Sequence, residues 1–357
     1  MDKNAKIYVA GHTGLVGSAI VRRLRALGYH RIVTRTSSEL DLRNQQNVED
    51  FFSSEKPEYV FLAAARVGGI LANSTYKADF IYDNIQISTN VIGASYRRGV
   101  RKLLNLGSSC IYPKMASQPI KEEYLLTGPL EETNEPYAVA KIAAIKLCRY
   151  FNEQYGTNFI SVMPTNLYGP YDNFNLETSH VLPALIRKFH LAALLRAKLY
   201  DEIRKDLKKR PLGFAGVIEG APTTTTFIQS LNELGITDGA VRVWGSGQPR
   251  REFLHVDDLA EACVYLMQKF DYAQIGELVN IGVGEDLTIK ELSSIIMRVV
   301  GFEGNIEFDA SKPDGVPRKL LDISRLTSLG WTPRIALDRG IEQTFEWYIH
   351  SQDSKIP

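Results

Sequence analysis

The sequence predicts an α/β fold in which a doubly wound parallel sheet is joined to a smaller C-terminal lobe. The first half alternates short apolar, strand-like segments with amphipathic, helix-like ones. Such alternation is typical of a parallel sheet covered by helices on both faces. After residue 170 the alternation fades, so we expect the second lobe to come mainly from the C-terminal half. The strand-like segments are residues 6–10, 31–35, 59–65, 102–107 and 159–164.

The composition is that of an ordinary globular protein, with 357 residues, 44% hydrophobic and 23% charged. A formal net charge of +1 gives no reason to expect nucleic acid or a membrane surface as a partner. Cys110, Cys148 and Cys263 are widely spaced and form neither a disulfide framework nor a zinc pattern. We therefore expect no metal and a reducing, cytoplasmic location. We expect no transmembrane helix, because no apolar run is long enough to span a bilayer. We also expect no signal peptide, because a strand-like segment at residues 7–10 runs straight into a glycine-rich turn and leaves no room for one.

The first strand-like segment ends in a glycine-rich turn, Gly11-His12-Thr13-Gly14-Leu15-Val16-Gly17, and a helical pattern follows. Glycines allow a tight turn and let the backbone approach a pyrophosphate, which then lies at a helix N-terminus. The spacing is G-x-x-G-x-x-G, and such a turn is a weak signal by itself. Between the first strand and the first helix of an alternating fold, however, it predicts a Rossmann-like dinucleotide site.

The end of the second strand decides which dinucleotide is expected. An acidic residue there favours NAD, because it bonds to the ribose 2′-hydroxyl. This sequence has Arg35 instead, followed by Thr36 and Ser37, a set suited to a 2′-phosphate. A surface arginine without a ligand is the alternative. We predict NADP(H) as the cofactor.

The chain is expected to contain two functional parts. We expect residues 1–168 to form the dinucleotide-binding domain, with a returning segment near residues 252–284. Residues 169–251 and 285–357 would form the substrate-binding lobe, with an insertion near residues 191–240.

The insertion opens with a helical pattern, because Leu195, Leu199, Ile203 and Leu207 recur every four residues. Its basic residues are more typical of a solvated helix face than of a surface for an acidic partner. Residues 223–226 are expected to form a loop.

A catalytic set follows from Tyr137 and Lys141, which lie four residues apart and hence on one helical face. A nearby ammonium lowers the pKa of a tyrosine, which can then exchange a proton with a carbonyl oxygen as hydride reaches the carbon. Ser108 and Ser109 end a strand and supply hydroxyls for the same oxygen. A lone Tyr-x-x-x-Lys is often accidental, but together with the glycine turn it predicts a reductase.

Longer motifs make the sequence resemble a known family. They are AAARVGGI (63–70), GSSCIYP (107–113), NEPY (134–137), MPTNLYGP (163–170), REFLHVDD (251–258) and SKPDG (311–315). With the glycine turn and the tyrosine–lysine pair, they resemble the extended short-chain dehydrogenase/reductases, and within these the GDP-sugar 3,5-epimerase/4-reductases. The resemblance covers nearly the whole chain except residues 191–240, where the sequence is longer than the family pattern.

The resemblance implies a homodimer that epimerises GDP-4-keto-6-deoxymannose at C3 and C5 and then reduces it at C4 with NADPH. Epimerisation needs a base and an acid on opposite faces of the sugar, and the resemblance implies Cys110 and His180. A thiolate is a suitable base when its pKa is lowered, and an imidazole can donate near neutral pH. A cysteine after a strand is more often a core residue, and a histidine at a helix start can be structural.

The resemblance also implies a diphosphate-binding arginine, Arg251, whose planar guanidinium suits bidentate contacts. Weaker candidates for substrate contacts are Lys188, Trp244, Asp314 and Arg318, although Asp314 and Gly315 could form an ordinary turn. The candidates for cofactor contacts are Gly11, His12, Thr13, Gly14, Leu15, Val16, Gly17, Arg35, Asp41, Leu42, Leu106, Gly107, Ser108, Ser109, Tyr137, Lys141, Pro164, Thr165, Asn166, Leu167 and His180.

Other functions remain open at this point. A nucleotide-sugar 4-epimerase or dehydratase would recycle a tightly held cofactor, so stoichiometric NADPH consumption would exclude it. A non-catalytic NADP-binding regulator would have no need of Ser108, Tyr137 and Lys141, which are intact here. GDP-sugars of the colitose or deoxyheptose type are alternative substrates.

Overall fold

The computed structural model describes residues 1–212, 223–312 and 314–350. Contacts divide the chain into two compact units. The first consists of Met1–Tyr171, Glu252–Gly284 and Leu320–Ile335, and the second of Asp172–Arg251, Glu285–Lys319 and the described residues from Ala336 on.

Residues 320–335 were expected in the substrate-binding lobe but belong to the first unit. The reason is a set of hydrogen bonds that attach both ends of this stretch to that unit. The Ile120 amide donates to the Leu320 carbonyl at 2.8 Å. Near the other end, the Asp258 carboxylate accepts from the amides of Arg334 and Ile335.

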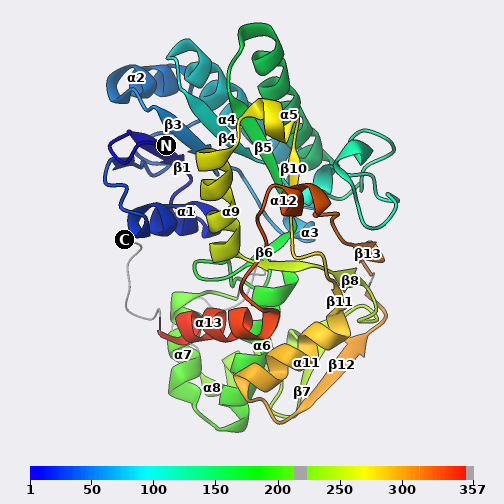
Figure 1. The fold of residues 1–357 in the computed structure, drawn as a ribbon. Helices are drawn as coiled ribbons and strands as arrows, with labels where there is room; N and C mark the ends of the chain where they lie inside the picture. Colours follow the sequence, from blue (N-terminus) through cyan, green and yellow to red (C-terminus); the bar gives the residue numbers. More distant parts are fainter. Residues whose placement is uncertain (213–222, 313, 351–357) are drawn as a thin grey trace. The chain divides into compact units, whose positions relative to one another are not determined.

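The first unit is built on a parallel sheet of six strands, which confirms the predicted fold class (Figure 1). The strand order is β10-β5-β4-β3-β1-β2, and every neighbouring pair is parallel. Since the carboxyl ends of parallel strands share one edge of a sheet, the turns after β1, β3, β4 and β5 meet there. The strands are β1 (Ile7–Ala10), β2 (Ile32–Val33), β3 (Tyr59–Leu62), β4 (Lys102–Leu106), β5 (Phe159–Pro164) and β10 (Val279–Ile281).

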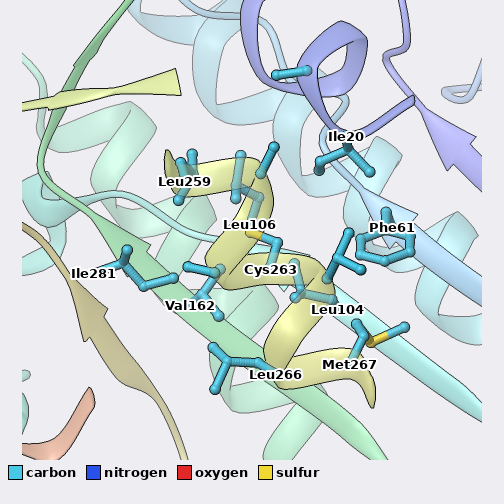
Figure 2. Packing of buried hydrophobic residues seen from close by; sticks show 14 of the residues in the cluster. Ile20, Phe61, Leu104, Leu106, Val162, Leu259, Cys263, Leu266, Met267 and Ile281 are labelled. Atoms are coloured by element: carbon cyan, nitrogen blue, oxygen red, sulfur yellow. The ribbon is translucent and has the colours of Figure 1, made fainter. Parts of the chain in front are cut away.

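Helices cover both faces of this sheet (Figure 1). Helices α1 (Leu15–Ala26) and α9 (Val256–Lys269) pack on one face, whereas α2 (Gln45–Glu55), α4 (Lys77–Arg97) and α5 (Glu135–Tyr155) pack on the other. Figure 2 shows Leu259, Cys263 and Leu266 of α9 against side chains of β4 and β5. Cys148 packs in the opposite layer, so Cys148 and Cys263 are both core residues.

The remaining elements of the first unit are short. Strands β6 (Asn166–Tyr168) and β9 (Phe253–His255) form a separate parallel pair. The helical turns are α3 (Ile70–Thr75), η1 (Ser109–Ile111), η2 (Glu122–Tyr124), α10 (Tyr272–Ile275) and α12 (Ser324–Ser328).

The second unit combines helices with two small sheets. Strand β7 (Ala240–Trp244) pairs in parallel with β12 (Asn305–Asp309). In the other sheet, β8 (Arg250–Arg251) lies between antiparallel β11 (Leu287–Thr288) and parallel β13 (Arg318–Lys319). The helices are α6 (Val181–Arg196), α7 (Tyr200–Lys209), α8 (Thr224–Glu233), α11 (Ile289–Val300) and α13 (Leu337–His350).

The predicted insertion helix is wrong in detail, because the chain breaks between α6 and α7. Lys198 has a left-handed backbone with φ of 56°, and Leu199 is half exposed instead of joining the apolar stripe. Leu195, Ile203 and Leu207 are buried as expected. The expected loop at residues 223–226 is also wrong, because Thr223 caps α8 by accepting from the Thr226 amide at 3.2 Å. Residues 213–222 of the insertion lie outside the described residues.

None of the helices within the described ranges combines the length and apolar character that crossing a membrane requires.

Candidate active site

The glycine turn leads directly from β1 into α1. Gly11 has φ of +82°, and the Gly14 amide donates to the Gly11 carbonyl at 3.1 Å. No side chain in the described part of the chain caps the start of α1, and Thr13 and Gly14 are exposed. The first amides of the helix are therefore available to an anion.

The glycines of the turn allow close backbone contacts, which suit a bound dinucleotide. A Cβ atom at Gly17 would lie 2.1 Å from the Gly11 carbonyl oxygen, and one at Gly11 would lie 2.8 Å from Ala64 Cα. Only glycine allows the turn, the helix and the segment after β3 to approach so closely. The buried Nδ1 atom of His12 has no hydrogen-bond partner within the described residues, and burial lowers the pKa of this imidazole. These observations agree with a nucleotide diphosphate at the turn.

Arg35 follows β2 and is partly exposed. Its Nη1 donates to the Thr34 carbonyl at 2.8 Å, and its Nη2 pairs with Glu55 at 2.7 Å. A guanidinium carries five N–H donors, so three remain for a ligand. The guanidinium also lies 5.5 Å from the Phe51 ring centre, which helps to fix its orientation.

The other cofactor candidates are turns at the same edge of the sheet. The Asp41 carboxylate is bound by Arg43 at 2.9 Å, and the Leu42 carbonyl accepts from Asn90. After β5, the Thr165 amide donates to the Ile281 carbonyl at 3.0 Å, and Asn166 Nδ2 donates to the Glu252 carbonyl at 2.8 Å. These hydrogen bonds thus fix the turns, whereas Leu167 packs against the hydrophobic core of the first unit.

The first unit brings Ser108, Tyr137 and Lys141 together. Ser108 lies two residues after β4 and precedes the turn η1, whereas Tyr137 and Lys141 lie in the first two turns of α5. The Lys141 ammonium is buried and lies 5.7 Å from the centre of the Tyr137 ring. It donates to the carbonyl oxygen of Leu106 at 2.8 Å.

The protonation of these groups differs from the expectation. The pKa of Tyr137 is raised, chiefly by burial and then by the charge of Cys110, although a hydrogen bond with Ser108 opposes this. The predicted lowering by Lys141 is therefore wrong for the chain by itself. Burial lowers the pKa of Lys141 to about 8, with the charge of Cys110 acting in the other direction. A protonated phenol beside a cationic lysine is the state that a proton donor needs.

Cys110 belongs to the same cluster, because the turn that carries it packs against α5, the helix of Tyr137 and Lys141. It lies in the 3-10 turn η1 and is 8% exposed. Its amide donates to the Ser108 hydroxyl at 3.4 Å. By contrast, burial raises the pKa of Cys148 to about 12 and also raises that of Cys263. Of the three thiols, only Cys110 lies beside the predicted reductase set.

Sequence reasoning did not identify a role for Glu252, which follows Arg251 and is fully buried. Its carboxylate accepts from the amides of Val283, Gly284 and Leu321 at 2.5, 2.8 and 3.1 Å. A Cβ atom at Gly282 would lie 2.3 Å from it. Glu252 thus fixes the chain after β10. In the sequence, the only signal for this role was an acidic residue inside the REFLHVDD motif.

In the second unit, Arg251 lies on β8 and is partly buried. Its Nη1 donates to the carbonyls of Arg250 and Val316 at 2.8 and 2.6 Å. Burial lowers the pKa of Arg251, while the charge of Asp314 acts against this. Carbonyl oxygens bind the guanidinium without neutralising it, so its positive charge remains available to an anionic ligand.

Arg318 and Asp314 are both engaged by other protein groups. Arg318 Nε pairs with Asp286, which also binds Arg250 at 2.7 Å. Asp286 thus offsets the charge of Arg318, so Arg318 is a weaker ligand for phosphate than Arg251. Asp314 accepts from the amide and hydroxyl of Ser246 at 2.9 and 2.6 Å, and thereby closes a loop next to Arg251. Pro313 of the SKPDG motif lies outside the described residues.

The remaining candidates of the second unit are spread over three places. Lys188 on α6 donates to the carbonyls of Leu234 and Arg242 at 2.8 and 3.0 Å, and burial lowers its pKa to about 8. Trp244 ends β7 and is 58% exposed, which suits stacking on a ring. His180 is an exposed N-cap residue of α6.

His180 and Cys110 belong to different units, and each is described within its own unit. In the REFLHVDD motif, His255 caps α9 by accepting from the Asp257 amide at 3.2 Å.

Comparison with known proteins adds a family and close relatives. The family model described as "NAD dependent epimerase/dehydratase family" matches residues 7–216 and 215–282. A putative GDP-L-fucose synthase 2 from Arabidopsis thaliana is 54% identical over 351 residues, covering 98% of this chain and 94% of that protein. The GDP-L-fucose synthase of Escherichia coli K12 is 48% identical over 354 residues, covering 98% of both.

A solved structure from Campylobacter jejuni is also similar. It is a GDP-D-glycero-L-gluco-heptose synthase in the presence of NADPH, with a TM-score of 0.90 and 42% identity. The match covers 98% of this chain and 99% of that one.

Proposed function

Because the chain belongs to the NAD dependent epimerase/dehydratase family, we propose that it converts GDP-4-keto-6-deoxy-D-mannose to GDP-L-fucose with NADPH. The cluster of Ser108, Cys110, Tyr137 and Lys141 is the observation that supports this most strongly. It places a thiol beside a complete reductase set, as a combined epimerase and reductase requires. The relatives named GDP-L-fucose synthase, at 54% and 48% identity, support the same substrate.

For the reduction, Tyr137 is the proton donor. When bound, NADPH supplies the hydride that reaches C4 of the sugar. The Tyr137 phenol gives its proton to the C4 oxygen, which becomes a hydroxyl, and the phenolate regains a proton from solvent. Ser108 donates a hydrogen bond to the same oxygen, and the Lys141 ammonium stabilises the transient phenolate. Lys141 is held for this task by the Leu106 carbonyl.

For the epimerisation, Cys110 is the base and His180 the acid. The C4 carbonyl acidifies the hydrogens at C3 and C5, so a thiolate can remove one and leave an enolate. An imidazolium on the opposite face returns a proton to the same carbon and inverts it. One proton is lost and one is gained at each centre, so the step needs no redox partner.

The glycine turn and Arg35 are the proposed NADP(H) contacts. Helix α1 presents free amides to the diphosphate, and the remaining N–H groups of Arg35 face the 2′-phosphate. The related heptose synthase was solved in the presence of NADPH, which supports the same cofactor here.

The second unit is the proposed binding unit for the nucleotide sugar. Arg251 would pair with the diphosphate, and the exposed ring of Trp244 would stack on a planar or apolar face. Lys188 and Asp314 mainly brace the surrounding loops. Arg318 is shared with Asp286 and contributes less charge.

A second copy of the chain is the proposed partner. Helices α4 and α5 together leave a shallow apolar surface, and Tyr82 and Tyr150 are each more than half exposed on them. Light scattering should show a dimer at working concentration, and a strict monomer would contradict this. The surface is lined by Lys77, Ala78, Ile81, Glu135, Pro136 and Val139.

We also propose a cytoplasmic location, because the three cysteines are widely spaced and odd in number, a usage that favours a reducing compartment.

One assay tests the proposed function. Purified protein is incubated with GDP-4-keto-6-deoxymannose and NADPH, and the product is identified by NMR. We expect GDP-L-fucose, with one NADPH oxidised for each product molecule. A GDP-4-keto-heptose is the comparison substrate, because the relative from Campylobacter jejuni acts in that class by name. Faster turnover of the heptose, or no NADPH oxidation with either sugar, would contradict the proposal.

A further inference from the structure

Tyr112 and Asn280 form a buried hydrogen bond in the first unit that no proposed catalytic step uses. Tyr112 is 3% exposed, and Asn280, in the middle of β10, is fully buried. The Tyr112 hydroxyl donates to Asn280 Oδ1 at 2.6 Å. These residues are 168 positions apart in sequence.

The rest of Asn280 is equally fixed. Its Nδ2 donates to the carbonyls of Ile120 and Asp322 at 3.0 and 3.2 Å, and its backbone amide donates to Glu122 at 3.1 Å. In register, Asn280 lies opposite Met163 of β5. Because each polar group of the side chain has a partner, Asn280 cannot turn without breaking several bonds. It is therefore a rigid anchor that belongs to the sheet.

Through Tyr112, Asn280 anchors the turn that carries Cys110. Tyr112 is the residue after η1, and Cys110 is the middle residue of that turn. On the other side of the turn, the Ser108 hydroxyl accepts from the Cys110 amide. Ile111, between the thiol and the tyrosine, is fully buried. The turn is thus held at both ends, by Ser108 and by Tyr112.

The reductase groups have other supports. Lys141 is held by the Leu106 carbonyl, and Tyr137 is part of the long helix α5. Loss of the Tyr112 hydroxyl would free one end of the cysteine turn but would leave these supports in place.

We infer that the Tyr112–Asn280 hydrogen bond positions Cys110 for proton removal, and so controls epimerisation separately from reduction. This inference rests on the proposed function. Tyr112 and Asn280 are positioning residues, because they act through the cysteine turn. A displacement of about 1 Å can slow a reaction by about 100-fold, so a loosened turn is enough to impair the base.

The test uses the full-length Tyr112→Phe variant, which loses the hydroxyl and keeps the ring. Solvent deuterium uptake at C3 and C5 of the substrate should fall by about tenfold or more, while the affinity for NADPH stays within about twofold of the wild type. Among reduced products, the share of the unepimerised GDP-6-deoxyhexose should rise. Tyr265→Phe is the matched control, since its hydroxyl donates to the Leu329 carbonyl at 2.8 Å in another part of the unit.

A second measurement reads the cysteine turn without substrate. Iodoacetamide labels thiolates, and mass spectrometry shows which cysteine reacts at each pH. In Tyr112→Phe, the midpoint of Cys110 labelling should move to higher pH, because the thiol drifts from the positive charge of Lys141. Cys148 and Cys263, both buried, should stay unlabelled and show that the variant is folded.

The outcomes separate this inference from the proposed function. Wild-type protein without any deuterium uptake would refute the proposed function, and the labelling profile would still decide the position of Cys110. Unchanged uptake and an unchanged labelling midpoint in Tyr112→Phe would overturn the inference. It would also fail if uptake and NADPH affinity fell equally, or if Cys148 and Cys263 became labelled, because Tyr112 would then serve the fold as a whole.

Discussion

Lys141 Nζ donates a hydrogen bond to the main-chain oxygen of Leu106 at 2.8 Å, which joins α5 to the end of β4. Leu106 is followed by Gly107 and Ser108, so the lysine and the serine of the proposed reductase set are held by the same strand end. A Cβ atom at Gly107 would lie 2.2 Å from Met163 Cε, which shows how closely β4 and β5 pack there. The geometry of the reductase set is therefore a property of the sheet edge.

The burial of Lys141 predicts how the rate of reduction depends on pH. Because burial lowers the pKa of Lys141 to about 8, the ammonium is present below that pH and is lost as pH rises through it. The rate of C4 reduction should therefore fall as pH rises above about 8. Lys141→Met should be slow at every pH and lack this inflection. Lys146→Met is the control that should keep the inflection. Lys146 lies on the same helix as Lys141 but pairs with Glu277. A flat profile between pH 6 and 10 would contradict the role of Lys141.

Tyr137→Phe tests the proton donor. The change removes the phenolic hydroxyl and keeps the ring, so turnover should fall by about 10²–10⁴-fold, the usual range for general acid catalysis. Affinity for the GDP-sugar, measured by calorimetry, should change little. Tyr265→Phe serves as control because its hydroxyl lies in another part of the unit. Near-normal reduction by Tyr137→Phe would refute the assignment.

Arg35→Ala tests the choice of cofactor. If Arg35 binds the 2′-phosphate, the variant should lose affinity for NADPH by about tenfold or more, since hydrogen bonds to charged groups contribute about 1.5–3 kcal/mol. Affinity for NADH should change much less. Arg101→Ala, which removes an exposed arginine paired with Glu58, should leave both affinities unchanged. Equal losses for both cofactors in fluorescence titrations would show that Arg35 does not distinguish them.

Much of the first unit could be predicted because its signals are local in sequence. The glycine turn occupies seven consecutive residues, and Tyr137 and Lys141 are one helical turn apart. Strand–helix alternation then places Ser108 and the glycine turn at the same edge of the sheet. Each of these features depends on spacing over a few residues, which a single sequence displays.

Other features could not be predicted because they depend on contacts between distant residues. The Tyr112–Asn280 bond joins positions 168 apart, and Asp286 lies 36 and 32 residues from the arginines it binds. The pKa of Tyr137 is raised chiefly by burial, which the sequence does not display, instead of being lowered as expected from Lys141. The break at Lys198 was missed because the apolar spacing of four continues across it.

Cys110→Ser separates the two halves of the proposed reaction. Enolisation needs a base but no hydride, since the C4 carbonyl already acidifies C3 and C5. A serine hydroxyl is far less acidic than a thiol and gives a poor base, so solvent deuterium uptake should stop. Tyr137→Phe should still take up deuterium, but more slowly than the wild type, because it lacks the hydrogen bond to the carbonyl. Mass spectrometry of the nucleotide sugar follows the uptake, and NMR gives the stereochemistry of the product.

Two further variants sharpen this prediction. Cys110→Ser should retain Tyr137 and Lys141, so it should reduce the unepimerised ketone to a GDP-6-deoxyhexose of the D-series. Cys148→Ser is the matched control, because burial raises the pKa of that thiol to about 12 and it packs in the core. His180→Asn should impair the return of the proton, so net epimerisation should fall more than exchange. Wild-type epimerisation by Cys110→Ser would make Cys110 a packing residue and remove the main support for a bifunctional enzyme.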